Sequence, residues 1–288
     1  MTVADDVGVQ SFELPCRDGL TIRGEAYRSA AAAPPTTGRG SVIICHGFKG
    51  FAHWAFFPHL ARMLAKSGLT AITFDFSGSG VGADRESFTD AEAFEQNTFT
   101  RELEDIELVE EYARRIGWIN GKFGLFGHSR GGGMAILYAA AEGSNVNSLV
   151  TWAAISYPNR WSPEDVAKWR QRGYADITNS RTGQVMRLGT ALLDDVELHG
   201  RTKVNIESAA KKIKVPWLII HGTADETVPS SEAEHLHSVS SGVSTLRLIE
   251  GGNHGFDAKH PLEKIPPVLE RVVAETVKFF VNNATSMK

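Results

Sequence analysis

Apolar residues recur along the chain in short continuous runs, and these runs alternate with longer stretches of helical periodicity. Six runs of five to seven residues are typical of strands in a parallel sheet, most of them apolar enough to be buried on both faces. They are residues 41–45, 69–74, 122–126, 148–154, 215–220 and 244–249. Two further β-like runs, 11–17 and 20–27, flank Asp18-Gly19 and predict a hairpin.

Four segments between and after these runs predict helices. Residues 54–67 have helical spacing and end before Gly68, a favoured residue just past a helix end. Residues 98–116 carry an apolar stripe with Glu and Arg on the opposite face. Residues 131–141 are small and apolar, and 268–281 form a closing helix. Repeated strand-then-helix units predict an α/β fold, in which helices cover both faces of a mostly parallel sheet.

The 60 residues from 155 to 214 do not follow this alternation of strands and helices, since they contain no buried strand of the same kind. We interpret them as a helical insertion over the sheet, a cap within a single domain that spans residues 1–288. The alternative is a surface excursion with no functional role. The insertion is rich in aromatic and basic side chains, namely Tyr157, Trp161, Trp169, Tyr174, Arg160, Arg170, Arg172 and Arg181.

Composition narrows the classes of protein. With 288 residues and 42% hydrophobic content the chain can bury a full core, and 22% charged residues exclude wholesale disorder. A net charge of -4 does not indicate the basic surface that binds nucleic acid. No apolar run reaches the roughly 18 residues of a membrane span. The first residues lack the features of a secretory signal, so we expect a cytoplasmic protein. We expect Cys16 and Cys45 to be two reduced, buried thiols.

The strongest chemical signal is Gly127-His128-Ser129-Arg130-Gly131, a Gly-x-Ser-x-Gly pattern. The pattern alone is weak, because glycine and serine are common. Here an apolar strand, 123–126, comes before it and a small-residue helix, 131–141, follows. That strand–turn–helix context is what a nucleophile elbow requires, and it makes Ser129 the candidate nucleophile. The alternative is a glycine-rich turn with an idle serine.

A serine nucleophile needs a histidine base and a group that orients it. His254 lies in a glycine-rich loop after the last strand, and Asp225 follows the fifth. The chain order Ser, Asp, His is the one expected for a nucleophile elbow of this kind, and all three residues come just after strands. Rivals as base are His46, His221 and His260, and rivals as acid are Glu226 and Asp257. His128 adjoins Ser129 in the sequence, so we expect it to point away and not to serve as the base.

Acyl transfer also needs donors for an oxyanion. We expect one from the backbone N–H of Arg130 and the other from that of Phe48, in the loop after the first buried strand, with Lys49 as the alternative to Phe48. No metal or organic cofactor is required. Aromatic side chains are expected to line an apolar substrate pocket, namely Phe51, Trp54, Trp161 and Trp169.

Residues 46–48, 127–131, 222–225 and 252–254 together resemble the α/β-hydrolase superfamily, and the resemblance extends from about residue 20 to 281. Within it, the sequence is most similar to capped serine esterases of the feruloyl-esterase and serine-aminopeptidase-like group. Members of that group carry an insertion where residues 155–214 lie. The resemblance implies a triad and an oxyanion hole, formed by Ser129, Asp225 and His254 and by Phe48 and Arg130.

These observations predict a serine carboxylesterase acting on a small-molecule ester, with no nucleic acid or membrane partner. An aminopeptidase, amidase or thioesterase using the same triad is an alternative, as is a non-catalytic ligand-binding protein of the same fold. A homodimer stays open. An aminopeptidase needs acidic residues near its site to hold a free amine, and the insertion offers Glu164, Asp165, Asp176, Asp194, Asp195 and Glu197.

Overall fold

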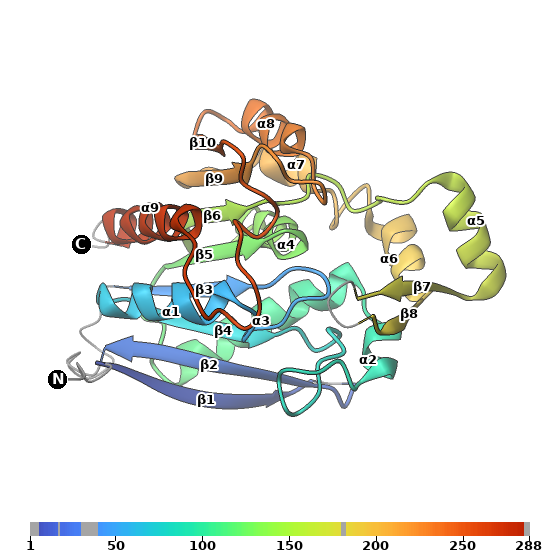
Figure 1. Cartoon of the computed structure of the whole chain (residues 1–288), viewed down its shortest axis with the longest axis horizontal. Helices are drawn as coiled ribbons and strands as arrows, with labels where there is room; N and C mark the ends of the chain where they lie inside the picture. The colour runs from blue at the N-terminus through green and yellow to red at the C-terminus, as the bar shows by residue number, and fades with distance from the viewer. Residues whose placement is uncertain (1–5, 17, 30–39, 180–182, 285–288) are drawn as a thin grey trace.

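The computed structural model describes residues 6–16, 18–29, 40–179 and 183–284. Within these ranges, eight strands form one sheet in the order β1-β2-β4-β3-β5-β6-β9-β10 (Figure 1). The strands are β1 Val7–Pro15, β2 Thr21–Ser29, β3 Ser41–Cys45, β4 Thr70–Asp75, β5 Phe123–His128, β6 Val146–Trp152, β9 Trp217–Gly222 and β10 Ser244–Ile249. Every strand predicted from the sequence is present, so the predicted fold class is confirmed.

The sheet is antiparallel only at one edge. β1 and β2 form the predicted hairpin around Asp18-Gly19, with Pro15 opposite Thr21, and β2 is antiparallel to β4. From β4 to β10 all neighbouring strands are parallel. The carboxyl ends of the parallel strands therefore meet along one edge, which is where such sheets hold their sites.

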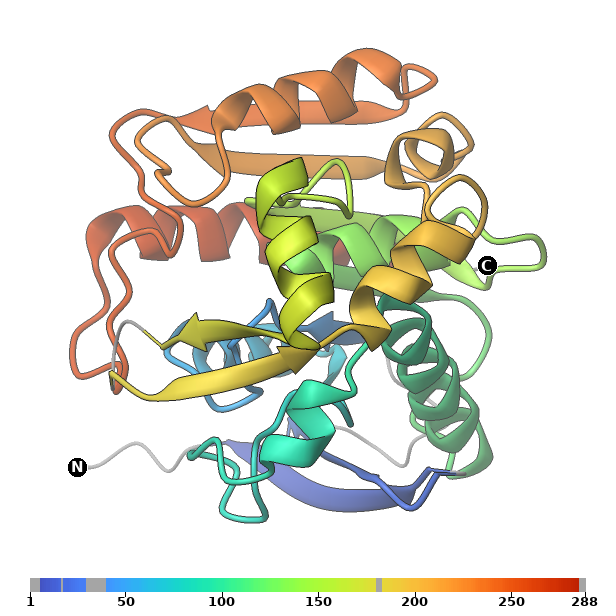
Figure 2. The same cartoon turned by 90° about the vertical axis from the view of Figure 1, so that its right-hand side faces the viewer.

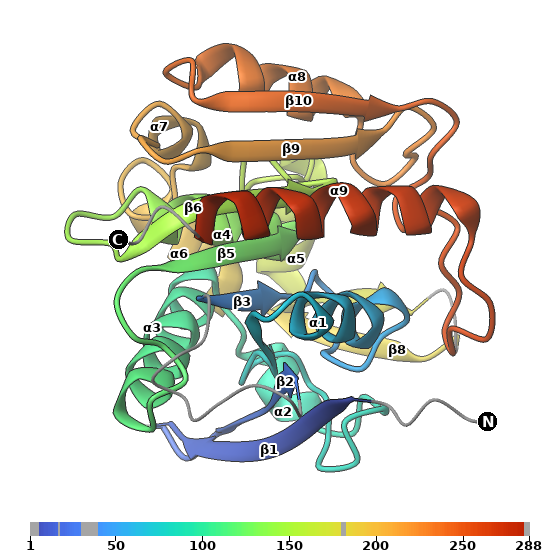
Figure 3. The ribbon, with the colours of Figure 1, turned by 90° about the vertical axis from the view of Figure 1, so that its left-hand side faces the viewer.

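Helices cover both faces of the sheet. α1 (Phe56–Lys66) and α9 (Pro267–Ala284) pack on one face, where they share a buried apolar cluster with β3, β5, β6 and β9 (Figure 3). α3 (Phe99–Arg115), α4 (Arg130–Ala139) and α8 (Ser230–Val239) pack on the other. None of the helices in the described ranges is long and apolar enough to span a membrane.

One face of α3 differs from its prediction. We expected its acidic residues to point away from the core, but three of them are buried. Buried carboxylates are tolerated where hydrogen bonds satisfy their oxygens, and each of these has such partners. The pairs are Glu102 with Asn97 and Arg130, Asp105 with Ser77, and Glu110 with Arg114, Tyr138 and Asn145.

The insertion, residues 155–214, lies beyond the carboxyl ends of β3, β5 and β6, and Figure 2 views it from outside. The sequence had suggested a wholly helical insertion, and the structure differs from that prediction. Between its helices lies an antiparallel hairpin whose second strand alternates exposed Val185 and Arg187 with buried Met186 and Leu188. Its elements are α5 Pro163–Arg172, β7 Tyr174–Thr178, β8 Val185–Gly189, α6 Ala191–His199 and α7 Ile206–Ala210, and α2, Ala91–Glu95, contacts β8.

Candidate active site

Ser129 occupies the sharp turn between β5 and α4. Its backbone has φ 56° and ψ -122°, a region that residues with a side chain rarely adopt, so the turn is strained. Glycines on both sides make the turn sterically feasible. A Cβ on Gly127 would lie 2.2 Å from the Gly131 carbonyl oxygen, and one on Gly131 would lie 2.2 Å from the His46 carbonyl oxygen.

The loop after β3 lies directly against this turn. A Cβ on Gly47 would come within 2.9 Å of Ser129 Cβ, so only glycine fits there. His46 holds the loop in place, because its Nε2 accepts a hydrogen bond from Phe76 N–H at 3.1 Å and its Nδ1 donates to the Gly47 carbonyl at 2.8 Å. Burial lowers the pKa of His46, which keeps the ring in the neutral form that this bonding requires.

Both expected oxyanion donors lie at this junction. Phe48 and Arg130 line the same pocket as Ser129. Arg130 is the first residue of α4, so its backbone N–H is one of those that a helix start leaves without an intrahelical acceptor. The Arg130 side chain has a separate role: its Nε donates to Glu102 Oε2 at 3.0 Å in a buried ion pair.

Asp225 and His254 come together through loops after β9 and β10. Asp225 Oδ2 lies 2.8 Å from His254 Nδ1, while Oδ1 accepts the backbone N–H groups of Thr227 and Val228 at 2.8 and 2.9 Å. Burial by itself would raise the pKa of Asp225, but hydrogen bonds from His221, His254 and Val228 hold that pKa well below its usual range. The carboxylate is therefore ionised and orients the imidazole.

His254 uses Nδ1 on Asp225, which leaves Nε2 for the pocket that it lines together with Ser129. Within the described ranges no hydrogen bond joins Ser129 to His254. Such contacts are commonly long before substrate binds.

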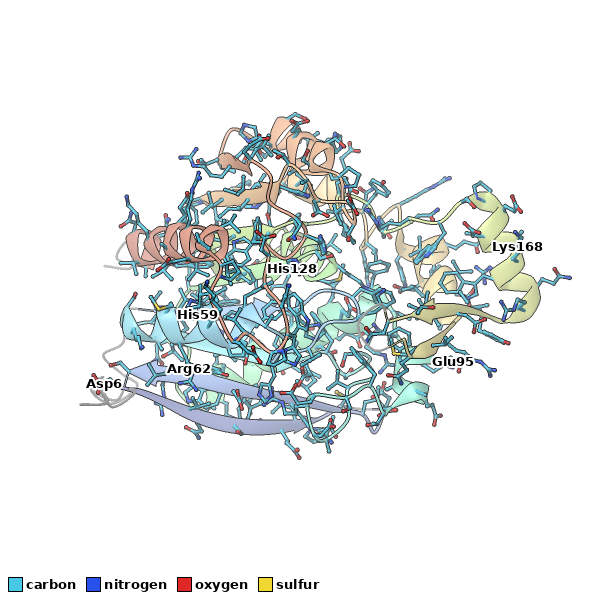
Figure 4. The ribbon with its side chains drawn as sticks, in the orientation of Figure 1. Asp6, His59, Arg62, Glu95, His128 and Lys168 are labelled. Atoms are coloured by element: carbon cyan, nitrogen blue, oxygen red, sulfur yellow. The ribbon has the colours of Figure 1, made fainter. Side chains whose placement is uncertain are left out.

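His128 contacts His254 directly, and we did not predict this contact from the sequence. Its Nε2 donates to the His254 carbonyl at 2.9 Å, and the two ring centroids are 4.7 Å apart. Burial, together with the nearby His254, lowers the pKa of His128 to about 3, so its ring stays neutral. Figure 4 shows His128 in the middle of the molecule. Its place beside the nucleophile in sequence had suggested that it would point away.

The remaining alternatives have other contacts. His221 Nε2 lies 2.8 Å from the Val228 carbonyl and 3.2 Å from Asp225 Oδ2, so His221 supports the acid from within the core. His260 lies between Ala55 N–H, at 3.0 Å, and Glu86, at 3.1 Å. Asp257 accepts a hydrogen bond from the Asn253 side chain, and Glu226 is exposed. None of these replaces His254 or Asp225 at the pocket.

The pocket that holds Ser129 and His254 has a volume of about 380 Å³. Trp54 and Trp161 line it as expected, but Phe51 and Trp169 do not. Phe51 is fully buried in the core. Trp169 packs edge-on behind Trp161, with ring centroids 5.0 Å apart. Further lining side chains that the sequence did not single out as substrate contacts are Lys49, Phe57, Phe99, Ile155, Pro158, Arg160, Asn179, Thr227 and Val228.

A second groove and the two cysteines lie outside this pocket, in the part of the chain that the structure describes. A larger groove of about 770 Å³, between α3, α4 and the end of the insertion, contains none of the candidate residues. No three His, Cys, Asp or Glu side chains in the described ranges gather as metal ligands. Cys45 is fully buried, which raises the pKa of its thiol well above the usual value, whereas Cys16 is only partly buried.

Comparison with known proteins finds several relatives of this chain. The family model that matches residues 36–198 is described as serine aminopeptidase, S33. Human monoglyceride lipase is 24% identical over 286 residues, which cover 88% of this chain and 86% of the lipase. Human serine hydrolase BPHL is 27% identical over 241 residues, covering 76% and 75%.

Solved structures show the same fold. Est1E from Butyrivibrio proteoclasticus with ferulic acid bound has a TM-score of 0.70 and 21% identity, and the match covers 94% of this chain and 98% of Est1E. A monoacylglycerol lipase from Paleococcus ferrophilus has a TM-score of 0.64 and 18% identity, covering 96% and 99%.

Proposed function

The chain belongs to the serine aminopeptidase S33 family of α/β-hydrolases, and from this premise we propose that it is a serine esterase. One observation carries the proposal. Ser129, on its strained turn, and His254, bonded to the Asp225 carboxylate, face the same pocket. A strained serine beside an oriented imidazole is the arrangement that nucleophilic acyl transfer requires.

In the proposed reaction, Ser129 Oγ attacks the ester carbonyl carbon while His254 Nε2 accepts the hydroxyl proton. The backbone N–H groups of Phe48 and Arg130 stabilise the negative charge on the carbonyl oxygen. His254 then gives the proton to the leaving alcohol, which departs as the bond to it breaks. A water molecule, deprotonated by His254, attacks the acyl-enzyme, and the proton returns to Ser129 as the acid leaves. Asp225 stabilises the imidazolium in both steps.

The chemistry of the pocket favours an ester over a peptide with a free amino terminus. An aminopeptidase needs an acidic side chain to hold the substrate ammonium group, and no carboxylate is among the described residues that line the pocket. The acidic residues of the insertion have other partners. Four of them form ion pairs: Asp194 and Glu197 with Arg170, Asp176 with Arg172, and Glu164 with Lys168. The other two form hydrogen bonds, Asp165 with Ser162 and Asp195 with the start of α3.

The insertion acts in this proposal as a cap. Residues of the insertion line the pocket together with the loop after β3, and Trp161 gives this part of the lining an apolar surface. A wall that excludes water strengthens the electrostatic contacts at the reacting carbonyl. The names of the human monoglyceride lipase and of the Est1E complex with ferulic acid are consistent with an ester as substrate.

The proposal is tested by measuring turnover of p-nitrophenyl acetate, butyrate and octanoate beside an aminoacyl p-nitroanilide. We expect ester hydrolysis that exceeds anilide hydrolysis, and a loss of at least about 10³-fold in Ser129→Ala. The variant should keep the thermal stability of the wild type. Faster anilide turnover would identify a peptidase, and a folded protein with no turnover of any substrate would favour the non-catalytic alternative.

A further inference from the structure

The pocket wall carries basic side chains from three parts of the chain. Lys49 comes from the loop after β3, Arg130 from α4 and Arg160 from the insertion. Within the described ranges no Asp or Glu lines the same pocket. The pocket therefore has basic residues among aromatic, aliphatic and neutral polar ones.

Two of the three cations already have carboxylate partners. Arg130 pairs with Glu102 at 3.0 Å, and its guanidinium lies 4.0 Å from the centre of the Phe99 ring. Arg160 pairs with Glu232 at 2.6 Å. These ion pairs largely cancel the charge of both arginines.

Lys49 differs from both arginines. Its Nζ donates to the Thr178 carbonyl at 3.2 Å, and no ion pair with a carboxylate is found for it among the described residues. An ammonium group has three N–H donors, so one neutral acceptor leaves two of them for a ligand. Partial burial lowers the pKa of Lys49, since the charged form has lost hydration without gaining a counter-charge.

The backbone at Lys49 adds a second, independent observation. Its φ is 57°, in the left-handed region where glycine or asparagine is the usual residue. A lysine there costs conformational free energy, and such strain gathers at functional positions. Lys49 also directly follows Phe48, the proposed oxyanion donor, so its side chain starts next to the reacting carbonyl.

We infer that the substrate is an anionic ester, with an apolar body between Trp54, Phe57 and Trp161 and a carboxylate that pairs with Lys49. The inference rests on the proposed esterase function and narrows its substrate class. The carboxylate belongs either to the acyl part or to the alcohol part. The competing role for Lys49 is purely structural, because its bond to Thr178 joins the loop after β3 to the insertion.

Matched ester pairs separate these roles. In the acyl arm, the mono-p-nitrophenyl ester of glutaric acid is compared with p-nitrophenyl pentanoate. In the alcohol arm, 4-acetoxybenzoate is compared with phenyl acetate. We expect the wild type to prefer the anionic member of at least one pair in kcat/KM. Lys49→Gln should lower that preference by about 10- to 100-fold, because a hydrogen bond to a charged group contributes about 1.5–3 kcal/mol.

Two further variants sharpen the result. Lys49→Arg keeps the positive charge and should retain most of the preference. Lys168→Gln removes a lysine that pairs with Glu164 at the outer end of the insertion, and it should leave the preference unchanged (Figure 4). The preference should also fall as salt is added, since ions screen a partly exposed charge pair.

Binding gives a readout that does not need turnover. Titration of Ser129→Ala with glutarate, followed by calorimetry, should show binding that Lys49→Gln weakens in the same background. An absence of anionic preference, or equal losses for both members of each pair in Lys49→Gln, would overturn the inference while leaving the esterase proposal intact. If neutral esters also fail to turn over, the esterase proposal fails, and glutarate binding alone then decides the role of Lys49.

Discussion

At the scale of single residues, His53 shows how charges fix the loop before α1. Its Nε2 lies 3.1 Å from Glu25 and its Nδ1 lies 3.3 Å from Glu86, while Arg85 approaches the same Glu25 oxygen at 3.2 Å. The hydrogen bond to Glu25 raises the pKa of His53. Burial alone would raise the pKa of Glu25, but hydrogen bonds from His53 and Tyr27 lower it to about 2.

This arrangement predicts a pH dependence of stability. Because the pKa of His53 is raised in the folded state, its contribution is complete below about pH 6.5, the value for unfolded histidine, and is lost as pH rises through the folded pKa. Glu25 acts in the opposite sense, and its contribution is lost as pH falls from about 4.3 towards 2.

The measurement is the melting temperature of wild type and His53→Gln between pH 5 and pH 9. The variant should melt about 1–3 °C lower at pH 5–6, and the difference should shrink above pH 8. His237→Gln serves as the control, since the ring of exposed His237 bonds the Ser244 hydroxyl and has no carboxylate partner among the described residues. A difference that is constant across the range would show that His53 packs there without titrating.

The residues expected to react could be located from the sequence because each follows a predicted strand, and the carboxyl ends of parallel strands converge. Asp225 and His254 are in hydrogen-bond contact as this convergence predicts, although their catalytic roles stay predictions. The sequence could not predict the contact of His128 with the His254 carbonyl, because the direction of a side chain in a turn depends on packing across the sheet. The side chain of Lys49 reaches Thr178, which lies 129 positions further along the chain, so local spacing carries no signal for it either.

At the scale of elements, a carboxylate of the insertion forms hydrogen bonds with the start of α3. Asp195, in α6, accepts the backbone N–H groups of Phe99 and Thr100 at 2.9 and 3.1 Å, and the Thr100 hydroxyl donates to it at 2.6 Å. It thus satisfies the orphan donors at the start of α3 from another element, and its negative charge suits the helix dipole there. Phe99, which this bond positions, lines the candidate pocket.

Asp195→Ala should therefore lower the free energy of unfolding by about 1–2 kcal/mol, the usual effect of losing a helix cap, and it should raise KM for ester substrates. Thermal melting and steady-state kinetics measure the two effects. The neighbouring Asp194 offers a matched control, because it pairs with Arg170 on an exposed surface. Asp194→Ala should change stability by less than about 0.5 kcal/mol. Equal effects of the two substitutions would contradict the role given to Asp195.

The elements of the insertion were harder to predict than those of the sheet. Strands buried on both faces form unbroken apolar runs, and the central strands of the sheet were found for that reason. β8 alternates exposed and buried residues over only a few positions and β7 has no buried residue, so both give a weak signal. The buried acids of α3 were missed because a carboxylate with distant partners has the same local pattern as an exposed one.

At the scale of the whole molecule, four loops converge on one edge of the sheet. The turn after β5, the loop after β3 and the loops after β9 and β10 meet at the carboxyl edge of the sheet, and the insertion lies beyond that edge (Figure 1). These loops bring residues from 47 to 254 to a single pocket. We propose that Ser129 is the nucleophile where these loops meet.

Covalent labelling tests that claim most directly. The intact protein is treated with a fluorophosphonate, which reacts with activated serines, and the adduct is mapped by peptide mass spectrometry. We expect one adduct per chain, on Ser129, slowed by a saturating ester and absent in Ser129→Ala, which remains folded. An adduct on another serine, or an unlabelled wild type that still hydrolyses esters, would contradict it.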